Sequence, residues 1–235
     1  ELIKGHIIEA KTFGDPVITE NGYLAAENGV VLGVYSALPE RFSGVPVTDY
    51  SNQLVLQGFC DMHLHAPQYP MLGMGMDLPL MDWLKAYTFK TEARFADADF
   101  ARLAYARLAA ELVKNGTTRV CIYSSTHTDA TLILMEELER AGICGYVGKV
   151  NMDRDSGECQ EETLESERET LRWLEECGRF SKTKPILTPR FTPSCTNELM
   201  DWLGKLAGER GLSVQSHLSE NYKEIELVKR LHPDC

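Results

Sequence analysis

From residue 54 onward, apolar residues follow two alternating patterns. Short, nearly continuous apolar runs are typical of buried strands, and apolar residues that recur three or four positions apart are typical of helices with one buried face. The predicted strands are residues 54–65, 119–123, 143–150, 185–190 and 212–217. The predicted helices are residues 80–89, a helix through Ala104, Leu108 and Leu112 that ends at Asn115, and residues 129–141, 161–176, 197–209 and 220–231. On the helix over 161–176, Leu164, Leu171 and Leu174 are expected to face inward.

Alternating strands and helices predict a parallel sheet with helical crossovers. The fold class is therefore α/β. A (β/α)₈ TIM-type barrel needs about 250 residues, and the segment from residue 54 to residue 235 is shorter. We therefore expect the first part of such a barrel, with about five βα units and with the later strands outside this sequence. The alternative is an open doubly wound sheet, but no glycine-rich phosphate turn follows the first strand.

Residues 1–53 have a different pattern. Short β-like runs at residues 3–8, 23–26 and 30–35 are separated by Gly, Pro and Asn. This pattern predicts a small antiparallel unit. We therefore expect two domains, residues 1–53 as a small β-domain and residues 54–235 as the barrel part.

Composition narrows the classes of function. The chain has 235 residues, is 43% hydrophobic and carries a net charge of -11. An acidic surface does not attract nucleic acid or an anionic membrane, so neither is expected as a partner and a small substrate is. No apolar run reaches the length of a membrane span and no signal peptide is evident, which predicts a cytoplasmic protein.

The seven cysteines include no Cys-x-x-Cys pair. This spacing indicates neither a disulfide scaffold nor a zinc ribbon. Cys60, Cys121 and Cys144 fall in predicted strands, where we expect them to be small buried residues.

His63 and His65 end the first barrel strand. Side chains two residues apart in a strand share a face, so both imidazoles can reach one metal ion. Two polar residues on a solvated strand face give the same pattern. The preceding run from Leu54 to Leu56 favours a metal site, because it indicates a buried strand whose end is where ligands bind. His217 ends the fifth strand, and the ends of parallel barrel strands converge over one mouth.

Glu220 follows His217 by three residues. It could take a proton from a metal-activated water and return it to the substrate. Alternatively, it is a carboxylate at a helix N-terminus, where the helix dipole favours it. The long segment 67–79 and the helix after it carry Met71, Met74, Met76 and Met81, which either line a pocket or, as we favour, fill gaps in the core.

These residues together resemble the metal-dependent deaminase branch of the amidohydrolase superfamily. The more specific resemblance is to the guanine deaminase family. It rests on His65-Ala-Pro-Gln68-Tyr69, the run from Asp77 to Leu84, Pro189-Arg190-Phe191 and the run from Ser216 to Asn221. It implies a (β/α)₈ barrel with a small β-sandwich built from both chain ends, one Zn²⁺ per subunit with Fe²⁺ as the alternative, and hydrolysis of guanine to xanthine and ammonia. A homodimer is also expected.

The resemblance also implies roles for individual residues. The implied metal ligands are His63, His65 and His217. The implied substrate-binding residues are His65, Gln68, Arg190, Phe191 and Glu220. The implied catalytic residues are Glu220, as the proton shuttle, and His217.

Two departures from the family pattern are evident. Gln57 stands where the family commonly has proline. A further histidine and an aspartate that bind the metal in the family lie on later strands, so we expect this segment alone to lack a complete site and a stable barrel. The alternatives are a sister enzyme that deaminates cytosine, a modified adenosine or a triazine, and a non-catalytic relative.

Other polar residues are assigned no part in the site. His127 is expected in a loop beside a helix N-cap, and His6 and His232 at the surface. Lys149 follows the third strand. Arg190 stands on the fourth strand, where relatives with two metal ions carry a bridging lysine, which favours a single metal.

Overall fold

The structure is a computed structural model that describes residues 1–12 and 14–234. The chain divides into two compact units, Glu1–Gly58 and Phe59–Cys235. The division falls at Gly58 rather than at residue 53, because the fourth strand of the small unit continues to Leu56.

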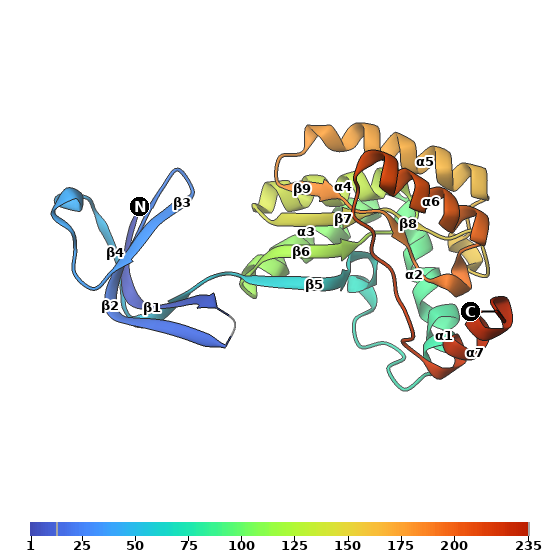
Figure 1. Cartoon of the computed structure of the whole chain (residues 1–235), viewed down its shortest axis with the longest axis horizontal. Coiled ribbons are helices and arrows are strands. Elements are labelled where there is room, and N and C mark those ends of the chain that lie inside the picture. The colour runs from blue at the N-terminus through green and yellow to red at the C-terminus, as the bar shows by residue number, and fades with distance from the viewer. Residues whose placement is uncertain (13, 235) are drawn as a thin grey trace. The chain divides into compact units, whose positions relative to one another are not determined.

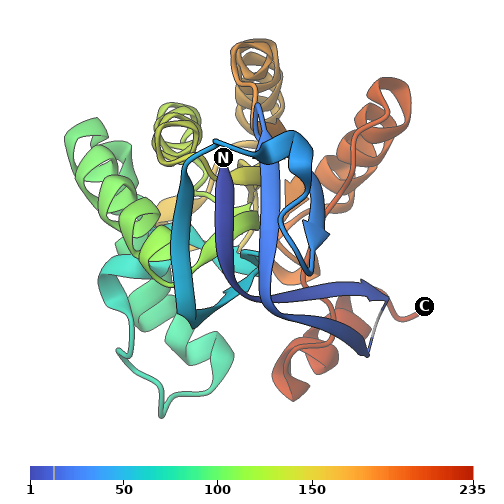
Figure 2. The same ribbon diagram turned by 90° about the vertical axis from the view of Figure 1, so that its left-hand side faces the viewer.

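The small unit is a four-stranded sheet in the order β3-β2-β1-β4. Its strands are β1 Leu2–Thr12, β2 Asp15–Glu27, β3 Val30–Tyr35 and β4 Val47–Leu56, with a 3₁₀ turn, η1, at Glu40–Phe42. The β1–β2 and β2–β3 pairs are antiparallel, as predicted, whereas β1 and β4 run parallel. Figure 2 shows these four strands in blue.

The run from Leu54 to Leu56 does not lie in the strand that carries the histidines. It pairs with His6–Ile8 of β1 at the end of β4. Gln57 and Gly58 then interrupt the extended chain before β5 begins at Phe59. The prediction of one continuous strand over residues 54–65 was therefore wrong.

The larger unit contains parallel strands. They are β5 Phe59–His65, β6 Thr117–Tyr123, β7 Cys144–Gly148, β8 Val150–Asn151, β9 Thr183–Pro185 and β10 Thr188–Pro189. The sheet order is β5-β6-β7-β9, β8 pairs with β10, and a parallel bridge joins Leu187 to Val214. This bridge is the only strand-type pairing found in the predicted strand 212–217. Along β5, β6, β7 and β9 the strand order follows the chain, without the reversal of a doubly wound sheet, and the short pair β8 and β10 follows the same order, so the unit is the front part of a barrel.

Helices follow the strands as predicted. They are α1 Leu80–Trp83, α2 Phe89–Ala93, α3 Ala98–Lys114, α4 Thr128–Ala141, α5 Thr163–Glu176, α6 Asn197–Arg210 and α7 Tyr222–Leu231. A π-turn, η3 Leu84–Thr88, joins α1 to α2 within the predicted helix over residues 80–89. Five 3₁₀ turns complete the unit: η2 Ala66–Met71, η4 Arg94–Ala96, η5 Gly157–Cys159, η6 Cys177–Arg179 and η7 Thr192–Ser194.

The four longest helices cover the outer side of the parallel strands. Figure 1 labels α3 to α6 beside β6, β7 and β9, and Figure 2 shows them in an arc from green to orange-red. The predicted stops of α4 and α6 are confirmed, because Gly142 and Gly211 adopt left-handed C-cap conformations with φ of 78° and 62°. At the other end of α3, the Asp97 side chain accepts hydrogen bonds from the backbone N–H groups of Asp99 and Phe100.

The core of this unit lies between the strands and the helices. Its largest buried members include Tyr105, Leu134, Met135, Leu138 and Trp173. The predicted inward face of α5 is only partly right. Leu171 and Leu174 pack against the core, but Leu164 is 75% exposed and the buried positions are Ser166, Thr170 and Trp173.

Two of these polar positions on α5 have a partner in the sheet. The amide nitrogen of buried Asn151 donates to Ser166 Oγ and Thr170 Oγ1, both at 2.8 Å. A buried amide must find hydrogen-bond partners, so polar residues replace leucines on this face.

The described cysteines are all free thiols. Cys121 is buried and Cys144 half-buried, but Cys60 is exposed, contrary to its prediction. Within residues 1–12 and 14–234, no helix is both long and apolar enough to cross a bilayer.

Candidate metal centre and adjoining pocket

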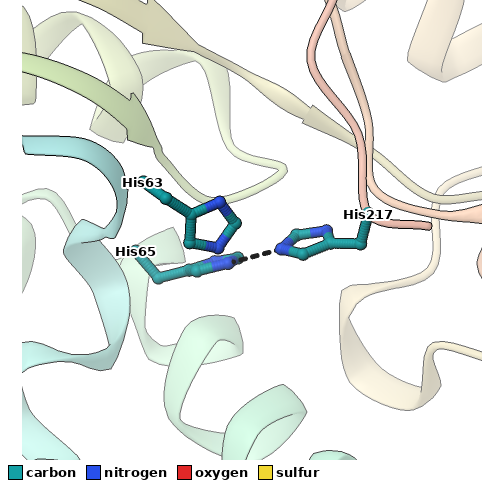
Figure 3. A group of neighbouring side chains, drawn as sticks. All are labelled: His63, His65 and His217. Atoms are coloured by element: carbon teal, nitrogen blue, oxygen red, sulfur yellow. Dashed lines mark hydrogen bonds between the residues drawn. The ribbon is translucent and has the colours of Figure 1, made fainter. Parts of the chain in front are cut away.

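Three histidines from two separate segments lie together. His63 and His65 are in β5, and His217 comes from the extended segment after α6. Each can offer one nitrogen such that the three nitrogens lie within 4.8 Å of one another. The Nε2 atoms of His65 and His217 are 2.9 Å apart, and Figure 3 marks this contact with a dashed line. Among the described residues, this is the group of histidine, cysteine and acidic side chains with the geometry of a metal site.

The backbone of Arg190 holds His217 in place. The Arg190 carbonyl accepts hydrogen bonds from the His217 backbone N–H at 3.0 Å and from the ring Nδ1 at 2.7 Å. A ring that donates through Nδ1 keeps the lone pair of Nε2 free, and metal-binding histidines usually have such a partner. The Nε2 of His217 is therefore the nitrogen available to an ion.

Tyr123, the last residue of β6, lies against all three rings. Its ring centroid is 5.1 Å from that of His63, 4.4 Å from that of His65 and 4.6 Å from that of His217. Burial raises the pKa of Tyr123 to about 12, so its phenol is neutral at pH 7. Sequence analysis missed Tyr123, although its position at the carboxyl end of a barrel strand was a usable signal.

The environment favours the neutral form of His65 and His217. Burial, and next the positive charge of Arg190, hold the pKa of His65 well below its usual range. Burial is also the main cause of the lowered pKa of His217. Neutral imidazole is the form that binds a metal.

The three histidines fit a divalent metal ion. Two nitrogens that each lie about 2.1 Å from a tetrahedral ion are about 3.4 Å apart, which is within the 4.8 Å limit of this group. The Nδ1 of His65 is buried and has no hydrogen-bond partner among the described residues. A hydrogen bond from Nδ1 to another part of the protein therefore does not explain why this ring is buried here. A site of imidazoles suits zinc, iron, copper or nickel.

The histidines open into a cavity of about 250 Å³. Its wall contains every residue predicted for the site: His63, His65, Gln68, Arg190, Phe191, His217 and Glu220. The other lining residues are apolar: Leu80, Trp83 and Leu84. The sequence therefore identified the residues that meet here, and their individual roles stay predictions.

Glu92 of α2 connects two of these residues, and sequence analysis missed it. Its Oε2 lies 2.5 Å from Nη1 of Arg190, and its Oε1 accepts a hydrogen bond from Nε2 of Gln68 at 3.2 Å. Arg190 is 3% exposed and Glu92 1%. The available signal was a charged residue one turn after Phe89 on the inner side of a short helix.

Glu220 lies in the turn between His217 and α7. The preceding residue, Ser219, has a φ of 56°, and the backbone N–H groups of Ser219, Glu220 and Asn221 all donate to the side chain of Glu224. Glu224 therefore supplies the carboxylate at the start of α7. The alternative interpretation of Glu220 as that carboxylate was wrong, and its side chain is exposed at the cavity.

A second cavity of about 430 Å³ shares Gln68, Leu80, Trp83 and Glu220 with the first. Met71 and Met76 line it, so at these two positions the pocket interpretation of the methionines holds. Met81 packs against a core cluster, as the favoured interpretation expected. Glu220 therefore borders both the cavity beside the histidines and this second, more apolar cavity.

The remaining candidates lie apart from the histidine group. His127 is the N-cap residue of α4, close to its prediction, and its ring contacts Ser125 Oγ at 3.2 Å. Lys149 is fully buried between β7 and β8 and pairs with Glu161 at 2.8 Å. His6 and His232 were expected at the surface, but both are half-buried.

Comparison with known proteins agrees with this geometry. Residues 54–235 match the Amidohydrolase family, and the chain belongs to that family, whose members are metal-dependent. Curated relatives include the guanine deaminase of Rattus norvegicus, 46% identical over 186 residues that cover 77% of this chain and 41% of the relative. The guanine deaminase of Dictyostelium discoideum is 42% identical, over 99% of this chain and 56% of the relative.

Solved structures give the same picture. A guanine deaminase from C. acetobutylicum with guanine bound in its active site matches with a TM-score of 0.96 and 43% identity, over 100% of this chain and 57% of that one. The guanine deaminase of E. coli matches with a TM-score of 0.88 and 28% identity, over 100% of this chain and 56% of that one. This chain thus spans about half the length of the relatives it matches.

Proposed function

We propose that this protein hydrolyses guanine to xanthine and ammonia. One observation carries the proposal: the three-histidine group and the side chains of Gln68, Arg190, Phe191 and Glu220 line one cavity. Guanine deaminases are the curated relatives at 42–46% identity cited above, and the C. acetobutylicum enzyme binds guanine.

The polar residues of the cavity suit a flat, neutral base. Arg190 donates hydrogen bonds to ring and carbonyl acceptors, and the amide of Gln68 pairs with the edge of the base. Phe191 offers an aromatic wall, and stacking of a base on such a ring contributes about 1–3 kcal/mol. A cavity built from these groups holds the ring in one orientation and rejects bases that leave its polar groups unpaired.

Glu220 carries the proton transfers in this proposal. A Zn²⁺ ion held by His63, His65 and His217 would supply the Lewis acidity that makes water a stronger acid near neutral pH. The Glu220 carboxylate takes the proton from the attacking water as the new C–O bond forms. It then returns that proton to the amino group, so that the C–N bond breaks and ammonia leaves.

The test uses the full-length, zinc-loaded protein. Loss of guanine and formation of xanthine are followed by ultraviolet absorbance, and cytosine, a modified adenosine and a triazine are assayed in parallel as alternative substrates. Faster turnover of guanine than of the other three is expected. A folded, zinc-loaded protein that leaves guanine unchanged would contradict the proposal.

Glu220→Gln tests the proton shuttle. It is expected to lower kcat by about 10²–10⁴-fold, the usual worth of a general acid or base, while the zinc content stays the same. Glu226→Gln on the exposed face of α7 is the matched control and should leave kcat unchanged. Equal losses in both variants would remove Glu220 from the mechanism.

Zinc rather than iron as the natural metal, a homodimer and a cytoplasmic location stay predictions. Metal analysis of the purified protein and its mass in solution test the first two.

A further inference from the structure

We propose that Glu92 is a positioning residue that makes the pocket select neutral purines. This inference rests on the proposed function and deepens it. Glu92 is not in the cavity wall, but each of its two carboxylate oxygens holds a different side chain that is. Through Gln68 and Arg190 it controls both the hydrogen-bonding pattern and the charge presented to a base.

The first effect is on Gln68. A carboxylate only accepts hydrogen bonds, so the Gln68 amide must turn its NH₂ group toward Glu92 Oε1, 3.2 Å away. The carbonyl oxygen of the same amide is then directed elsewhere and is available as an acceptor. The NH₂ and carbonyl ends of an amide have nearly the same shape, so the Gln68 amide could lie in either of two flipped orientations. Glu92 selects one of them, so that the cavity offers an acceptor at Gln68 and donors at Arg190. A base with N–H groups beside a carbonyl, as in guanine, matches that pattern.

The second effect is on charge. Arg190 and Glu92 are both almost fully buried and lie 2.5 Å apart, so the guanidinium is neutralised by its own partner before any ligand binds. The α2 helix also places the Phe89 ring against Arg190, with the guanidinium carbon 5.5 Å from the ring centroid. An anionic purine would therefore find no unpaired positive charge at Arg190, whereas a neutral base keeps the donors it needs.

Glu92→Gln keeps the size of the side chain but removes its charge. The new amide can donate as well as accept, so Gln68 is free to turn. Loss of a charged hydrogen bond predicts a rise in KM for guanine of about 10–100-fold, a smaller change in kcat and no change in zinc content. Urate is an anionic purine at neutral pH and should bind better relative to guanine, because the positive charge of Arg190 is then unpaired. The ratio of the urate inhibition constant to the KM for guanine should therefore fall by about tenfold or more.

Glu92→Asp separates charge from reach. It retains the negative charge on a shorter side chain, so KM should rise while the preference against urate is kept. It also provides a readout if Glu92→Gln fails to fold.

Glu137→Gln is the matched control for the loss of a buried carboxylate. Glu137 is equally buried, in α4, and pairs with Arg140 Nη1 at 2.6 Å and Arg102 Nη1 at 3.3 Å, away from the cavity. Its replacement should lower thermal stability and leave KM and the urate preference unchanged.

Binding of guanine and urate is measured by calorimetry in zinc-loaded proteins that also carry Glu220→Gln, because this background lacks the proton shuttle and so keeps the binding test separate from turnover. Wild-type conversion of guanine reports on the proposed function, and the variant-to-wild-type ratio of the two affinities reports on Glu92. A folded Glu92→Gln variant with both affinities unchanged, or the same shifts in Glu137→Gln, would overturn the inference.

Discussion

Replacing Gly148 with alanine should destabilise the barrel strongly. Gly148 ends β7. A Cβ atom at this position would lie 1.8 Å from Thr188 Oγ1, 2.8 Å from Gln215 Nε2 and 2.9 Å from the carbonyl oxygen of Ile186. The Thr188 side chain can rotate away, but the Ile186 carbonyl is part of the backbone. That backbone is held in place because the Ile186 N–H donates to the Val147 carbonyl at 3.0 Å.

Overpacking in a close-packed interior costs about 1–3 kcal/mol, and more where the backbone has to move. Because a backbone oxygen blocks this site, we expect about 3 kcal/mol. A loss of 1 kcal/mol shifts the Tm by about 2–4 °C for 150–250 residues and by less for a longer chain, so the Tm of the full-length protein should fall by no more than roughly 6–12 °C. The same substitution at Gly204, in α6, meets no atom within 4 Å and should hold or raise the Tm, because alanine favours a helix by about 1 kcal/mol over glycine.

Thermal unfolding of the two full-length, zinc-loaded variants by circular dichroism checks this contrast. Gly148→Ala should also bind zinc more weakly, since Thr188 Oγ1 and Gln215 Nε2 are hydrogen-bonded at 3.0 Å and Gln215 lies two residues before His217. A Gly148→Ala variant that melts with the wild type would show that the barrel interior relaxes far more easily than its close contacts indicate.

Two further predictions concern zinc binding by His217 and the stability of the fold at acidic pH. His217→Ala should lose most of its bound zinc on dialysis against a chelator, measured by atomic absorption, whereas His127→Ala should keep it; equal retention would exclude His217 as a ligand. Burial alone would raise the pKa of Glu139, but hydrogen bonds from the backbone N–H groups of Lys182 and Thr183 and from Ser181 lower it below its usual value of 4.5. Ionised Glu139 therefore stabilises the fold above pH 4.5, and this contribution is lost as the pH falls through the lowered pKa. Because solvent screens this partly exposed carboxylate, urea unfolding should show Glu139→Gln about 0.5–1.5 kcal/mol less stable than wild type at pH 7. The difference should shrink toward pH 3, and a constant difference would contradict this.

The parts of the fold that could be predicted depend on local chemistry. Gly142 and Gly211 end helices because a left-handed C-cap favours glycine, and this requirement is visible in the sequence. The proximity of His63, His65 and His217 could be predicted because the parallel strands of a barrel end at one mouth.

The parts that could not be predicted depend on partners distant in the chain. Leu54 reads as a buried strand residue, but it pairs with β1 of the small unit. The inner face of α5 is polar because Asn151, on a strand, needs partners there. Glu92 is likewise buried and charged because it pairs with Arg190, which lies 98 residues later in the chain.

Arg190 also ties two properties of the pocket to one peptide unit. Its side chain lines the cavity next to the three histidines, while its carbonyl holds His217 in the tautomer that leaves Nε2 free. Side-chain substitutions at this position should change base preference while leaving in place the carbonyl that holds the His217 ring. Insertions, deletions or proline substitutions beside it would shift the carbonyl and disturb the proposed metal ligand His217 at the same time. In laboratory evolution of new substrate preference, this short segment should accept changes of residue type and resist changes of length.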